Sequence, residues 1–374
     1  MTRVLQLVTG LDPGGAEIQV ASLSVELRRR GWDVAVASLL ETGSVARGLA
    51  EAGVPVITLG IRAGVADPRG LARLAARLGA FRPSILHAHM FHANILARLA
   101  RLVCPVPVVI STIHSAAETG RERRAGLRRR DLAYRLTGWL DDAVVAVSNA
   151  VAARHEAARA VNGRKLRVIA NGVDTSLFRP DEERRAMARR ELDVEDRFVW
   201  LAAGRLMWKK DHATLLRALA KAGDATLLVA GVGPLEAELR ALATELSIDA
   251  RFLGRRDDIP ALMNAADGLA LSSVVEGLPM ALIEAAASGL PAVATDAGGA
   301  SEIVVDGSTG FVTPVGDAGT LGAAMRRLME MPAGARLSMS EAARREAGRF
   351  NIQTVVSHWE NLYRELLENA GRWM

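Results

Sequence analysis

Cysteine and aromatic residues are scarce in this chain. Its 374 residues include one cysteine, Cys104, and aromatic side chains make up only 4%. One cysteine excludes an internal disulfide and a cysteine-based metal cluster, and we interpret Cys104 as a buried structural thiol. Few aromatic side chains are available to stack on bases, and we recognise no nucleic-acid-binding module. We therefore expect no nucleic-acid partner.

Long apolar runs are also missing. No uninterrupted apolar stretch reaches the roughly 18 residues that suggest a membrane-spanning helix. The first apolar segment, at residues 5–8, is too short for the core of a signal peptide. We therefore expect a cytoplasmic protein that touches a membrane at most on its inner face, as a peripheral protein.

The residues that are abundant are apolar and basic. Hydrophobic residues make up 50% of the chain, and its net charge is +5. A chain of this length is expected to form two domains rather than one core. We place these domains at residues 1–178 and 179–350, followed by a last helical segment at 351–374. The basic balance suits phosphorylated small molecules or anionic lipid.

Apolar strand patterns alternate with helical ones in both halves of the chain. We expect strands at residues 4–8, 34–38, 55–59, 85–88, 106–111, 141–147 and 166–169, and then, after a break at residues 178–180, at 198–203, 226–230, 250–253, 269–273, 292–294 and 311–312. Helical patterns separate most of them. This alternation predicts an α/β fold with two doubly wound parallel sheets. Ligands of such sheets bind at the carboxyl ends of the strands.

The run at residues 272–304 carries two carboxylates in a strand, loop, helix, strand arrangement. Glu276 lies on the loop and Glu284 lies within the helix that begins near Met280. The start of this helix offers free N–H groups that favour an anion. Two carboxylates beside an anion make sense if they accept hydrogen bonds from hydroxyls on either side of it. A nucleotide sugar has this layout of sugar hydroxyls, diphosphate and ribose hydroxyls.

This run, with its EGLP and GLP segments and the later DAGGASE, closely resembles the pattern of retaining family-4 glycosyltransferases. That resemblance implies the GT-B architecture, in which two Rossmann-like domains face a central cleft. It also implies transfer of a sugar from a nucleotide-sugar donor to an acceptor hydroxyl with retention of configuration. In the family, the first Glu lies near the transferred sugar and the second binds the ribose hydroxyls.

A pair of cations follows the first strand of the second domain. The segment GRLMWKKDHATLL, which contains Gly204 and Arg205, is similar to the family's Arg and Lys pair. Lys210 is the better match by spacing, and Lys209 is the alternative. Such cations stabilise the charge that a departing diphosphate gains in the transition state. We find no Asp-x-Asp motif, so we expect no metal and no cofactor.

Several turns are expected to touch the donor. The resemblance assigns the loop with Gly14 and Gly15 to the donor, together with Gly233, Gly277, Leu278 and Met280. Arg255 or Arg256 could lie against the nucleobase, and a solvated loop is the equal alternative.

Histidines near strand ends mark the first domain. The family has a His at the place of His114, near the transferred sugar, and we assign His114 to the donor sugar. His89 is placed near the acceptor, while His87 and His92 are expected to be structural. Asn171, in a segment that resembles the family's NGVD, is also assigned to the acceptor side. The acceptor is expected to be a sugar or a lipid-linked sugar.

The densest basic stretch, at residues 121–140, alternates arginines with Leu127, Leu132, Tyr134, Leu136 and Trp139. Such a segment could rest on an anionic membrane surface. The equal alternative is a solvated helix face with an ordinary buried stripe. For the whole chain, a nucleotide-sugar 2-epimerase and a non-catalytic nucleotide-sugar binding protein remain the alternative functions.

Overall fold

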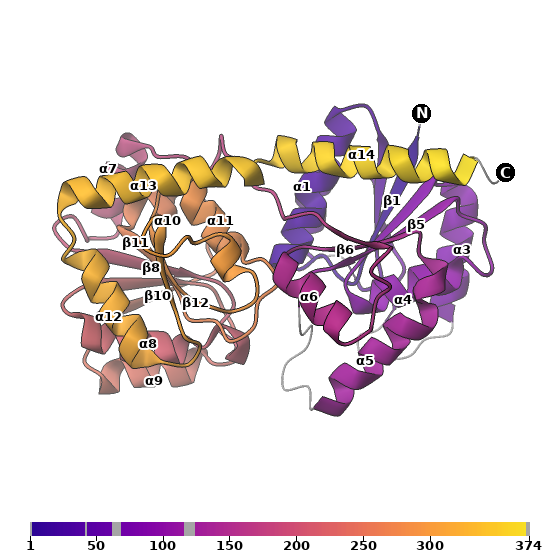
Figure 1. Ribbon diagram of the computed structural model, residues 1–374. Helices are drawn as coiled ribbons and strands as arrows, with labels where there is room; N and C mark the ends of the chain where they lie inside the picture. Colours follow the sequence, from indigo (N-terminus) through magenta and orange to yellow (C-terminus); the bar gives the residue numbers. More distant parts are fainter. Residues whose placement is uncertain (1, 42, 62–68, 116–123, 372–374) are drawn as a thin grey trace. The chain divides into compact units, whose positions relative to one another are not determined.

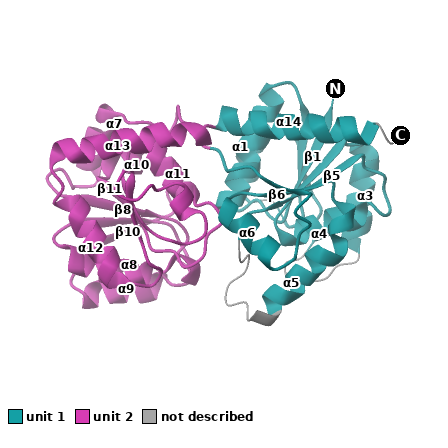
Figure 2. Cartoon of the chain, in the orientation of Figure 1, with its two compact units in different colours: residues 1–172, 352–374 teal, residues 173–351 magenta. Residues whose placement is uncertain are grey.

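The protein folds into two compact units. A computed structural model describes residues 2–41, 43–61, 69–115 and 124–371. One unit combines residues 1–172 with 352–374, and the other comprises residues 173–351 (Figure 2). The chain therefore passes between the units at Gly172 and returns at Ile352.

Unit 1 is built on a parallel sheet. Within the described residues this sheet has seven strands in the order β3-β2-β1-β4-β5-β6-β7, and all paired neighbours are parallel. The strands are β1 (Arg3–Val8), β2 (Asp33–Ser38), β3 (Val56–Thr58), β4 (Ile85–His89), β5 (Val108–Ile113), β6 (Ala143–Ala146) and β7 (Leu166–Val168). The order reverses between β1 and β4, which is where such sheets bind ligands.

Helices cover both faces of this sheet (Figure 1). They are α1 (Gly15–Arg29), α2 (Val45–Glu51), α3 (Arg69–Phe81), α4 (Phe91–Ala100), α5 (Arg124–Thr137), α6 (Asn149–Ala157), α14 (Ile352–Gly371) and the short 3-10 helix η1 (Gly138–Leu140). Alternate strand residues face opposite sides, so Val4 packs towards α1 and α14 while Leu5 packs towards α3 and α4.

The last helix, α14, belongs to the core of unit 1. Its residues Val356, Trp359 and Tyr363 are 0%, 3% and 0% exposed. They pack with α1 over β1, β2, β4 and β5. Figure 1 shows α14 in yellow beside the indigo α1. The C-terminal segment thus completes a hydrophobic face that begins with the first strand.

Unit 2 repeats the same architecture. Its described strands form a six-stranded parallel sheet in the order β10-β9-β8-β11-β12-β13. The strands are β8 (Val199–Ala203), β9 (Thr226–Ala230), β10 (Ala250–Gly254), β11 (Gly268–Leu271), β12 (Ala292–Thr295) and β13 (Gly310–Thr313). Here the order reverses between β8 and β11.

The helices of unit 2 again lie on both faces. They are α7 (Glu182–Glu191), η2 (Trp208–Lys210), α8 (His212–Ala222), α9 (Glu236–Glu245), α10 (Ile259–Ala265), α11 (Met280–Ala287), η3 (Ala300–Glu302), α12 (Ala318–Met329), α13 (Ala333–Ala347) and η4 (Gly348–Phe350). One core gathers α8, α9 and α12 around the fully buried Trp200 of β8. The predicted fold class, two doubly wound parallel sheets, is confirmed.

Two helices were not predicted from the sequence. The charged segment that follows the expected break at residues 178–180 forms α7, and Asp181 caps it by accepting a hydrogen bond from the N–H of Arg184. Its arginines are held by unit 2: Arg185 and Arg189 both pair with Asp267. The second is α10, which begins beside Pro260.

Candidate functional site

The loops that leave β8, β9, β10 and β11 carry most of the residues predicted to bind the donor. These four strands are neighbours in the sheet, and the order of unit 2 reverses between β8 and β11. Parallel strands end at one edge, so these loops share the carboxyl edge of the sheet. This is the edge at which we expected the candidate site.

Lys210 and Glu276 form an ion pair across two of these loops. The Lys210 Nζ atom lies 2.7 Å from Oε1 of Glu276, and the hydroxyl of Ser273 donates to the same oxygen at 2.6 Å. Both side chains are largely buried, with 22% and 13% of their surface exposed. Lys210 thus meets Glu276, while the Lys209 ammonium lies 6.0 Å from the ring of Trp208. The role of either lysine towards a diphosphate stays a prediction.

Backbone contacts fix the two loops to each other. The hydroxyl of Ser272 donates to the carbonyls of Lys210 and Asp211, both at 2.9 Å. The N–H of Val274 donates to the carbonyl of Lys209 at 2.8 Å. A cation and a carboxylate held this rigidly are preorganised, so they need little rearrangement when charge develops beside them.

A glycine of the next loop packs against the backbone of Glu276. Gly298 has a φ of +60°, and a Cβ there would lie 2.3 Å from the carbonyl oxygen of Glu276. No other residue fits this contact without displacing the loop. The hydroxyl of Thr295 also donates to the carbonyl of Ser273 at 2.6 Å. The loop with Glu276 is therefore supported on both sides.

Glu284 is a half-buried carboxyl on α11. Burial raises the pKa of Glu284 to about 7, and the nearby charge of Lys210 lowers it by a smaller amount. Within the described residues no hydrogen bond to its carboxyl group is found. A half-buried carboxyl without a protein partner is suited to a ligand hydroxyl.

Arg205 follows Gly204 at the end of β8, and its side chain is exposed. We find no ion pair or hydrogen bond for its guanidinium in the described part of the chain. Judged on the described residues, the candidate site therefore offers a guanidinium and a carboxyl without hydrogen-bond partners, and a lysine held by Glu276.

The loops after β8 and β9 touch backbone to backbone. A Cβ on Gly233 would lie 2.2 Å from the carbonyl oxygen of Leu206, so this position needs glycine for packing alone. Its contact with a donor stays a prediction. The same holds for Gly277, whose carbonyl accepts from the N–H of Gly299 at 2.9 Å.

The remaining predicted donor residues differ in exposure. Leu278 is 5% exposed, so its side chain belongs to the core and only its backbone could meet a ligand. Met280 is half-buried and begins α11. Arg255 lies 3.5 Å from Asp257, whereas Arg256 forms a two-fold hydrogen bond with Asp258 at 2.7 and 2.5 Å. The nucleobase role of either arginine stays a prediction.

In unit 1 the predicted histidines belong to one hydrogen-bonded chain. His114 Nε2 lies 3.1 Å from His89 Nδ1, and His89 Nε2 lies 2.8 Å from Gln6 Oε1. The Gln6 amide donates to the hydroxyl of Tyr363 at 3.3 Å, and this hydroxyl lies 2.6 Å from His87 Nδ1. The chain ends at Thr112, whose hydroxyl lies 2.7 Å from His87 Nε2.

This chain determines which nitrogen of each histidine carries the proton. Burial lowers the pKa of His114 to about 4 and holds the pKa of His89 well below 6.5, so both rings are neutral. A neutral ring has one donor and one acceptor nitrogen. His89 donates to Gln6 through Nε2, so its Nδ1 accepts from Nε2 of His114. The Nδ1 atom of His114 is then a bare acceptor, and it is buried with no hydrogen-bond partner among the described residues.

We revise the role of His89. It is 1% exposed and both of its ring nitrogens are engaged, so it offers an acceptor substrate no free polar atom. Its position behind His114 instead makes it a residue that orients His114. His87 is fully buried, in line with a structural role.

Gly14, Gly15 and Asn171 lie at the ends of elements of unit 1. Gly14 is the N-cap of α1 and Gly15 its first residue. Asn171 is 5% exposed, and the next N–H along the chain, of Gly172, donates to Gln19 at 2.8 Å. Their substrate contacts stay predictions. Cys104 is half-buried rather than buried, because it lies in the turn after α4.

The sequence interpretation missed Ser273, Gly298, Gln6 and Tyr363. The signal for Ser273 was the pair of serines, Ser272 and Ser273, at the end of a buried strand. Gln6 is a polar residue within an apolar strand and is 0% exposed, which was the signal for a buried hydrogen-bond network.

Metal ligands and membrane spans were also sought. No group of three or more His, Cys, Asp or Glu side chains in the described residues could hold a metal ion. No described helix is long and apolar enough to cross a membrane.

Together, two doubly wound parallel sheets and the loops at the carboxyl edge of the second define a GT-B-type α/β protein. Comparison with sequence families gives two matches. The model of "Glycosyl transferases group 1" matches residues 183–346, and that of "Glycosyltransferase Family 4" matches residues 13–177.

Relatives and solved structures agree with these matches. The D-inositol 3-phosphate glycosyltransferase of Mycobacterium tuberculosis is 30% identical, and the alignment covers 96% of this chain and 79% of that protein. The UDP-Gal:alpha-D-GlcNAc-diphosphoundecaprenol alpha-1,3-galactosyltransferase of Escherichia coli is 25% identical over 82% of this chain and 81% of its own. The chain belongs to the glycosyltransferases of this family.

The fold is shared with solved glycosyltransferase structures. Anabaena HepE in complex with UDP and glucose superposes with a TM-score of 0.87 at 23% identity, over 98% of this chain and 100% of that one. Sucrose-phosphate synthase of Thermosynechococcus elongatus gives a TM-score of 0.83 at 22% identity, over 99% of this chain and 100% of that one.

Proposed function

We propose that the protein is a retaining, metal-independent glycosyltransferase that moves a hexose from a nucleotide sugar to an acceptor hydroxyl. The observation that carries this proposal is the arrangement after β8 and β11. There the rigid pair of Lys210 and Glu276 lies in the loops that also hold Arg205, and Glu284 lies on α11, the helix after the β11 loop. Within the described residues, neither the Arg205 guanidinium nor the Glu284 carboxyl has a hydrogen-bond partner.

The cations act on the leaving group. When the bond between the anomeric carbon and the diphosphate breaks, the diphosphate gains negative charge. Arg205 and Lys210 stabilise that charge more than they stabilise the bound donor, which raises the rate of transfer. Fixed cations do the work that a divalent metal does in other transferases, so we propose that no metal is required.

The carboxylate of Glu276 holds the ammonium of Lys210 in position and does not attack the sugar as a nucleophile. Its Oε1 atom is already bound by Lys210 and Ser273, at 2.7 and 2.6 Å. We therefore propose that the acceptor oxygen attacks from the face that the diphosphate leaves. The new bond to the anomeric carbon forms as the old one breaks, and the acceptor proton passes to the leaving phosphate oxygen. This course retains the anomeric configuration without a covalent intermediate.

The other carboxyl and the histidine bind hydroxyls. Glu284 is proposed to accept from the ribose hydroxyls in its ionised form. The bare Nδ1 atom of His114 is proposed to accept from a hydroxyl of the transferred sugar.

The names of relatives guide the choice of substrates. The Escherichia coli relative uses UDP-Gal and a diphosphoundecaprenol-linked sugar, and HepE structures contain UDP or UDP-glucose. We propose a UDP-hexose donor and a sugar or lipid-linked sugar acceptor, in bacterial polysaccharide or glycolipid synthesis at the cytoplasmic face of the membrane.

A thermal-shift screen of nucleotide sugars is the first test. A donor at ~100 times its Kd raises the free energy of unfolding by ~2.7 kcal/mol, which is measurable as a higher Tm. Donors that raise the Tm are then incubated with candidate acceptors, with and without EDTA. Product of unchanged anomeric configuration by proton NMR, formed equally in EDTA, is expected. An inverted product, or activity that EDTA abolishes, would contradict the proposal.

The same screen separates the alternative functions. A 2-epimerase converts the donor sugar with no acceptor present, and a binding protein shifts the Tm without turnover. The paired cations favour transfer, because an enzyme or binding protein that keeps the diphosphate bound has less use for charge stabilisation in the transition state.

A further inference from the structure

Helix α5 has an exposed apolar stripe as well as a buried one. Leu132, Leu136 and Trp139, the last of them in η1, are 52%, 64% and 69% exposed. Their spacing of four and three residues places them on one helical face. The inner face is anchored separately, because Tyr134 is 2% exposed and lies against Phe91 of α4. The outer stripe is therefore not needed for the core.

The outer face is also basic. Arg128, Arg129 and Arg135 are exposed, and we find no ion pair for any of them in the described part of the chain. The one acidic residue of the described helix, Asp131, is paired with Arg154. The outer face of α5 thus presents uncompensated positive charge among large apolar side chains.

The turn after α4 extends the apolar surface. Leu102 and Val103 are 58% and 60% exposed. They follow Arg101, whose guanidinium donates to the carbonyl of Leu140 at 2.8 Å. This contact places the turn beside η1. We call these eight residues (102, 103, 128, 129, 132, 135, 136 and 139) the α5 surface.

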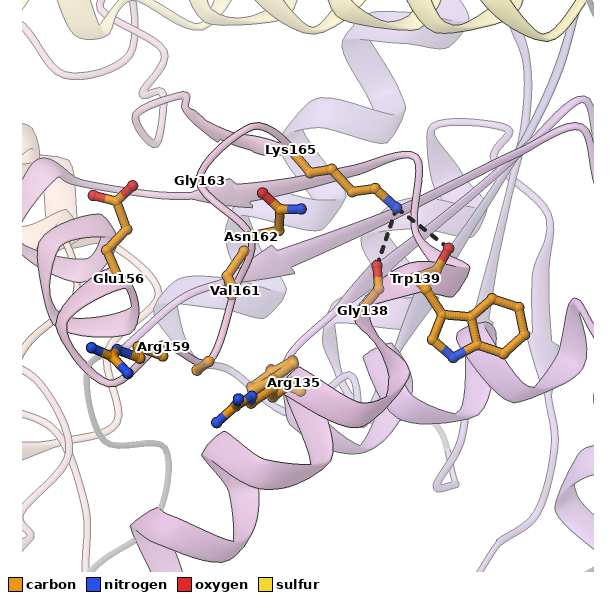
Figure 3. A pocket seen from close by; sticks show the side chains of 11 residues that line it. Arg135, Gly138, Trp139, Glu156, Arg159, Val161, Asn162, Gly163 and Lys165 are labelled. Atoms are coloured by element: carbon orange, nitrogen blue, oxygen red, sulfur yellow. Dashed lines mark hydrogen bonds between the residues drawn. The ribbon is translucent and has the colours of Figure 1, made fainter.

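A hollow of about 550 Å³ adjoins the α5 surface (Figure 3). Arg135, Trp139, Glu156, Arg159 and Lys165 are among its lining residues. The ammonium of Lys165 is engaged by the carbonyls of residues 138, 139 and 141, at 3.2, 3.3 and 2.5 Å. In Figure 3 the carboxylate of Glu156 extends to the side away from the two guanidiniums. The guanidiniums of Arg135 and Arg159 are therefore the groups of this hollow that can bind an anion.

We propose that the α5 surface binds an anionic lipid bilayer, with the adjoining hollow taking one lipid headgroup. Leucine and tryptophan side chains on a basic helix face suit insertion at the boundary between headgroups and acyl chains. The arginines then meet headgroup phosphates, each of which they can bind through two N–H groups.

Charge argues against a second copy of the chain as the occupant. A two-fold contact would place this basic face against itself, so the unpaired arginines would repel one another. A negatively charged bilayer is complementary to the same face. The membrane contact would bring a lipid-linked acceptor to unit 1. This consequence rests on the proposed function, whereas the lipid binding itself does not.

Vesicle flotation of the full chain tests the proposal. The wild type is expected to float with phosphatidylcholine vesicles that contain 30% phosphatidylglycerol at low salt. It should not float with phosphatidylcholine alone, and added NaCl should weaken the binding. The variant R128Q/R129Q/R135Q is expected to bind ~100-fold more weakly, since each basic residue near the surface contributes about 1 kcal/mol.

Two further variants separate the parts of the surface. The variant L132S/L136S/W139S lacks the side chains that insert into the bilayer. It should therefore lose the part of the binding that persists at high salt. R159Q should bind about fivefold more weakly, although Arg159 lies outside α5. The matched control is L337S/R345Q on α13, which removes an apolar residue that is 61% exposed and an arginine whose side chain is 71% exposed.

Each outcome decides the question. A wild type that stays unbound at low salt, or an arginine variant that floats as well as L337S/R345Q, overturns the proposal. A mass of two chains by light scattering that the L132S/L136S/W139S variant reduces to one would show that a second copy covers this face. Transfer to a water-soluble acceptor is measured in parallel and should be unchanged, so failure of lipid binding is distinguishable from failure of the enzyme. Thermal melts confirm that every variant is folded.

Discussion

At the residue scale, the account depends on how individual charged groups are held. Spacing alone could not choose between Lys209 and Lys210. The choice depends on the loop after β8, whose last turn η2 presents Lys210 to Glu276 and to the supporting hydroxyl of Ser273. Such a loop conformation is set by tertiary contacts that leave no periodic pattern in the sequence.

Glu284 was assigned to a ligand from its place in the motif, and that role stays a prediction. Its burial left no signal in the sequence. Between the ordinary pKa of 4.5 and the raised value of about 7, the folded state holds more protons than the unfolded state. The free energy of unfolding therefore falls as the pH rises through this range, and the loss persists above pH 7.

The variant Glu284→Gln tests this assignment. It removes the buried charge while keeping the shape, so we expect the free protein to be more stable than wild type at pH 8, by about 1 to 3 kcal/mol. At pH 4 the two proteins should be close in stability. Urea unfolding at both pH values measures this difference.

Donor binding should move in the opposite direction. The Glu284→Gln variant lacks the ionised acceptor for ribose hydroxyls, so its donor affinity should fall by ~10-fold, the equivalent of about 1.4 kcal/mol. Glu302, an acidic residue outside the predicted set, gives a matched control as Glu302→Gln. Equal donor affinity of the Glu284→Gln variant and wild type at pH 8 would contradict the assignment.

At the scale of elements, the order of strands and helices was predictable because both sheets are buried on both faces. Their strands are short, nearly continuous apolar runs, and the helices between them carry an apolar stripe. Helix α7 was not predicted because it is mostly charged. It is held by the cap at Asp181 and by ion pairs with Asp267 rather than by an apolar face.

The contact of α14 with the histidine chain could not be predicted from spacing. Tyr363 and Gln6 are separated by nearly the whole chain, and only the packing of α14 on β1 and β4 brings the hydroxyl of Tyr363 to Gln6 and His87. The C-terminal helix therefore does more than cover the sheet, because it fixes the proton arrangement that leaves His114 Nδ1 as an acceptor.

The variant Tyr363→Phe should expose this link. Loss of the hydroxyl leaves the Gln6 amide and His87 without a buried partner, which should lower the free energy of unfolding by ~1 to 3 kcal/mol. It should also allow the Gln6 amide to rotate. The proton of the His114 ring should then move from Nε2 to Nδ1, and a nitrogen-15 NMR spectrum should show this change of tautomer.

The other tyrosine of the chain provides the control. Tyr134 is also buried and accepts a hydrogen bond from Asn94 at 3.1 Å, but it lies outside the histidine chain. Tyr134→Phe should lower stability without changing the His114 signals. Identical His114 spectra for Tyr363→Phe and wild type would show that α14 does not set this tautomer.

At the scale of the whole molecule, unit 1 should lose more stability than unit 2 as the pH falls. Burial lowers the folded-state pKa of His114 from 6.5 to about 4, and it holds those of His87 and His89 well below 6.5. Below pH 6.5 the unfolded chain binds more protons at these residues than the folded unit, so they cost unit 1 stability as the pH falls. In unit 2, burial also lowers the pKa of His212 to about 4, but the Glu284 carboxyl has the opposite dependence over pH 4.5 to 7 and offsets this loss. Asp141 of unit 1, whose pKa burial raises to about 6, opposes the three histidines in the same way but is a single group.

Hydrogen exchange resolves the two units without separating them. Amides in β1, β4 and α14 should exchange faster at pH 5 than at pH 7, once the intrinsic pH dependence is corrected. Amides in β8 and β11 should lose less protection between pH 7 and pH 5 than the amides of unit 1. Equal loss of protection in both units at pH 5 would contradict this difference.

The central claim is that fixed cations after β8 stabilise the departing diphosphate. The most direct test is the single-turnover rate of sugar transfer by Lys210→Ala at saturating donor, with Lys209→Ala as the control. We predict that Lys210→Ala lowers this rate by ~100- to 1,000-fold, which is the loss expected when one preorganised hydrogen-bond donor to a developing anion is removed. Donor affinity should change far less, and Lys209→Ala should remain near wild type. A Lys210→Ala enzyme that transfers sugar at the wild-type rate would contradict the claim.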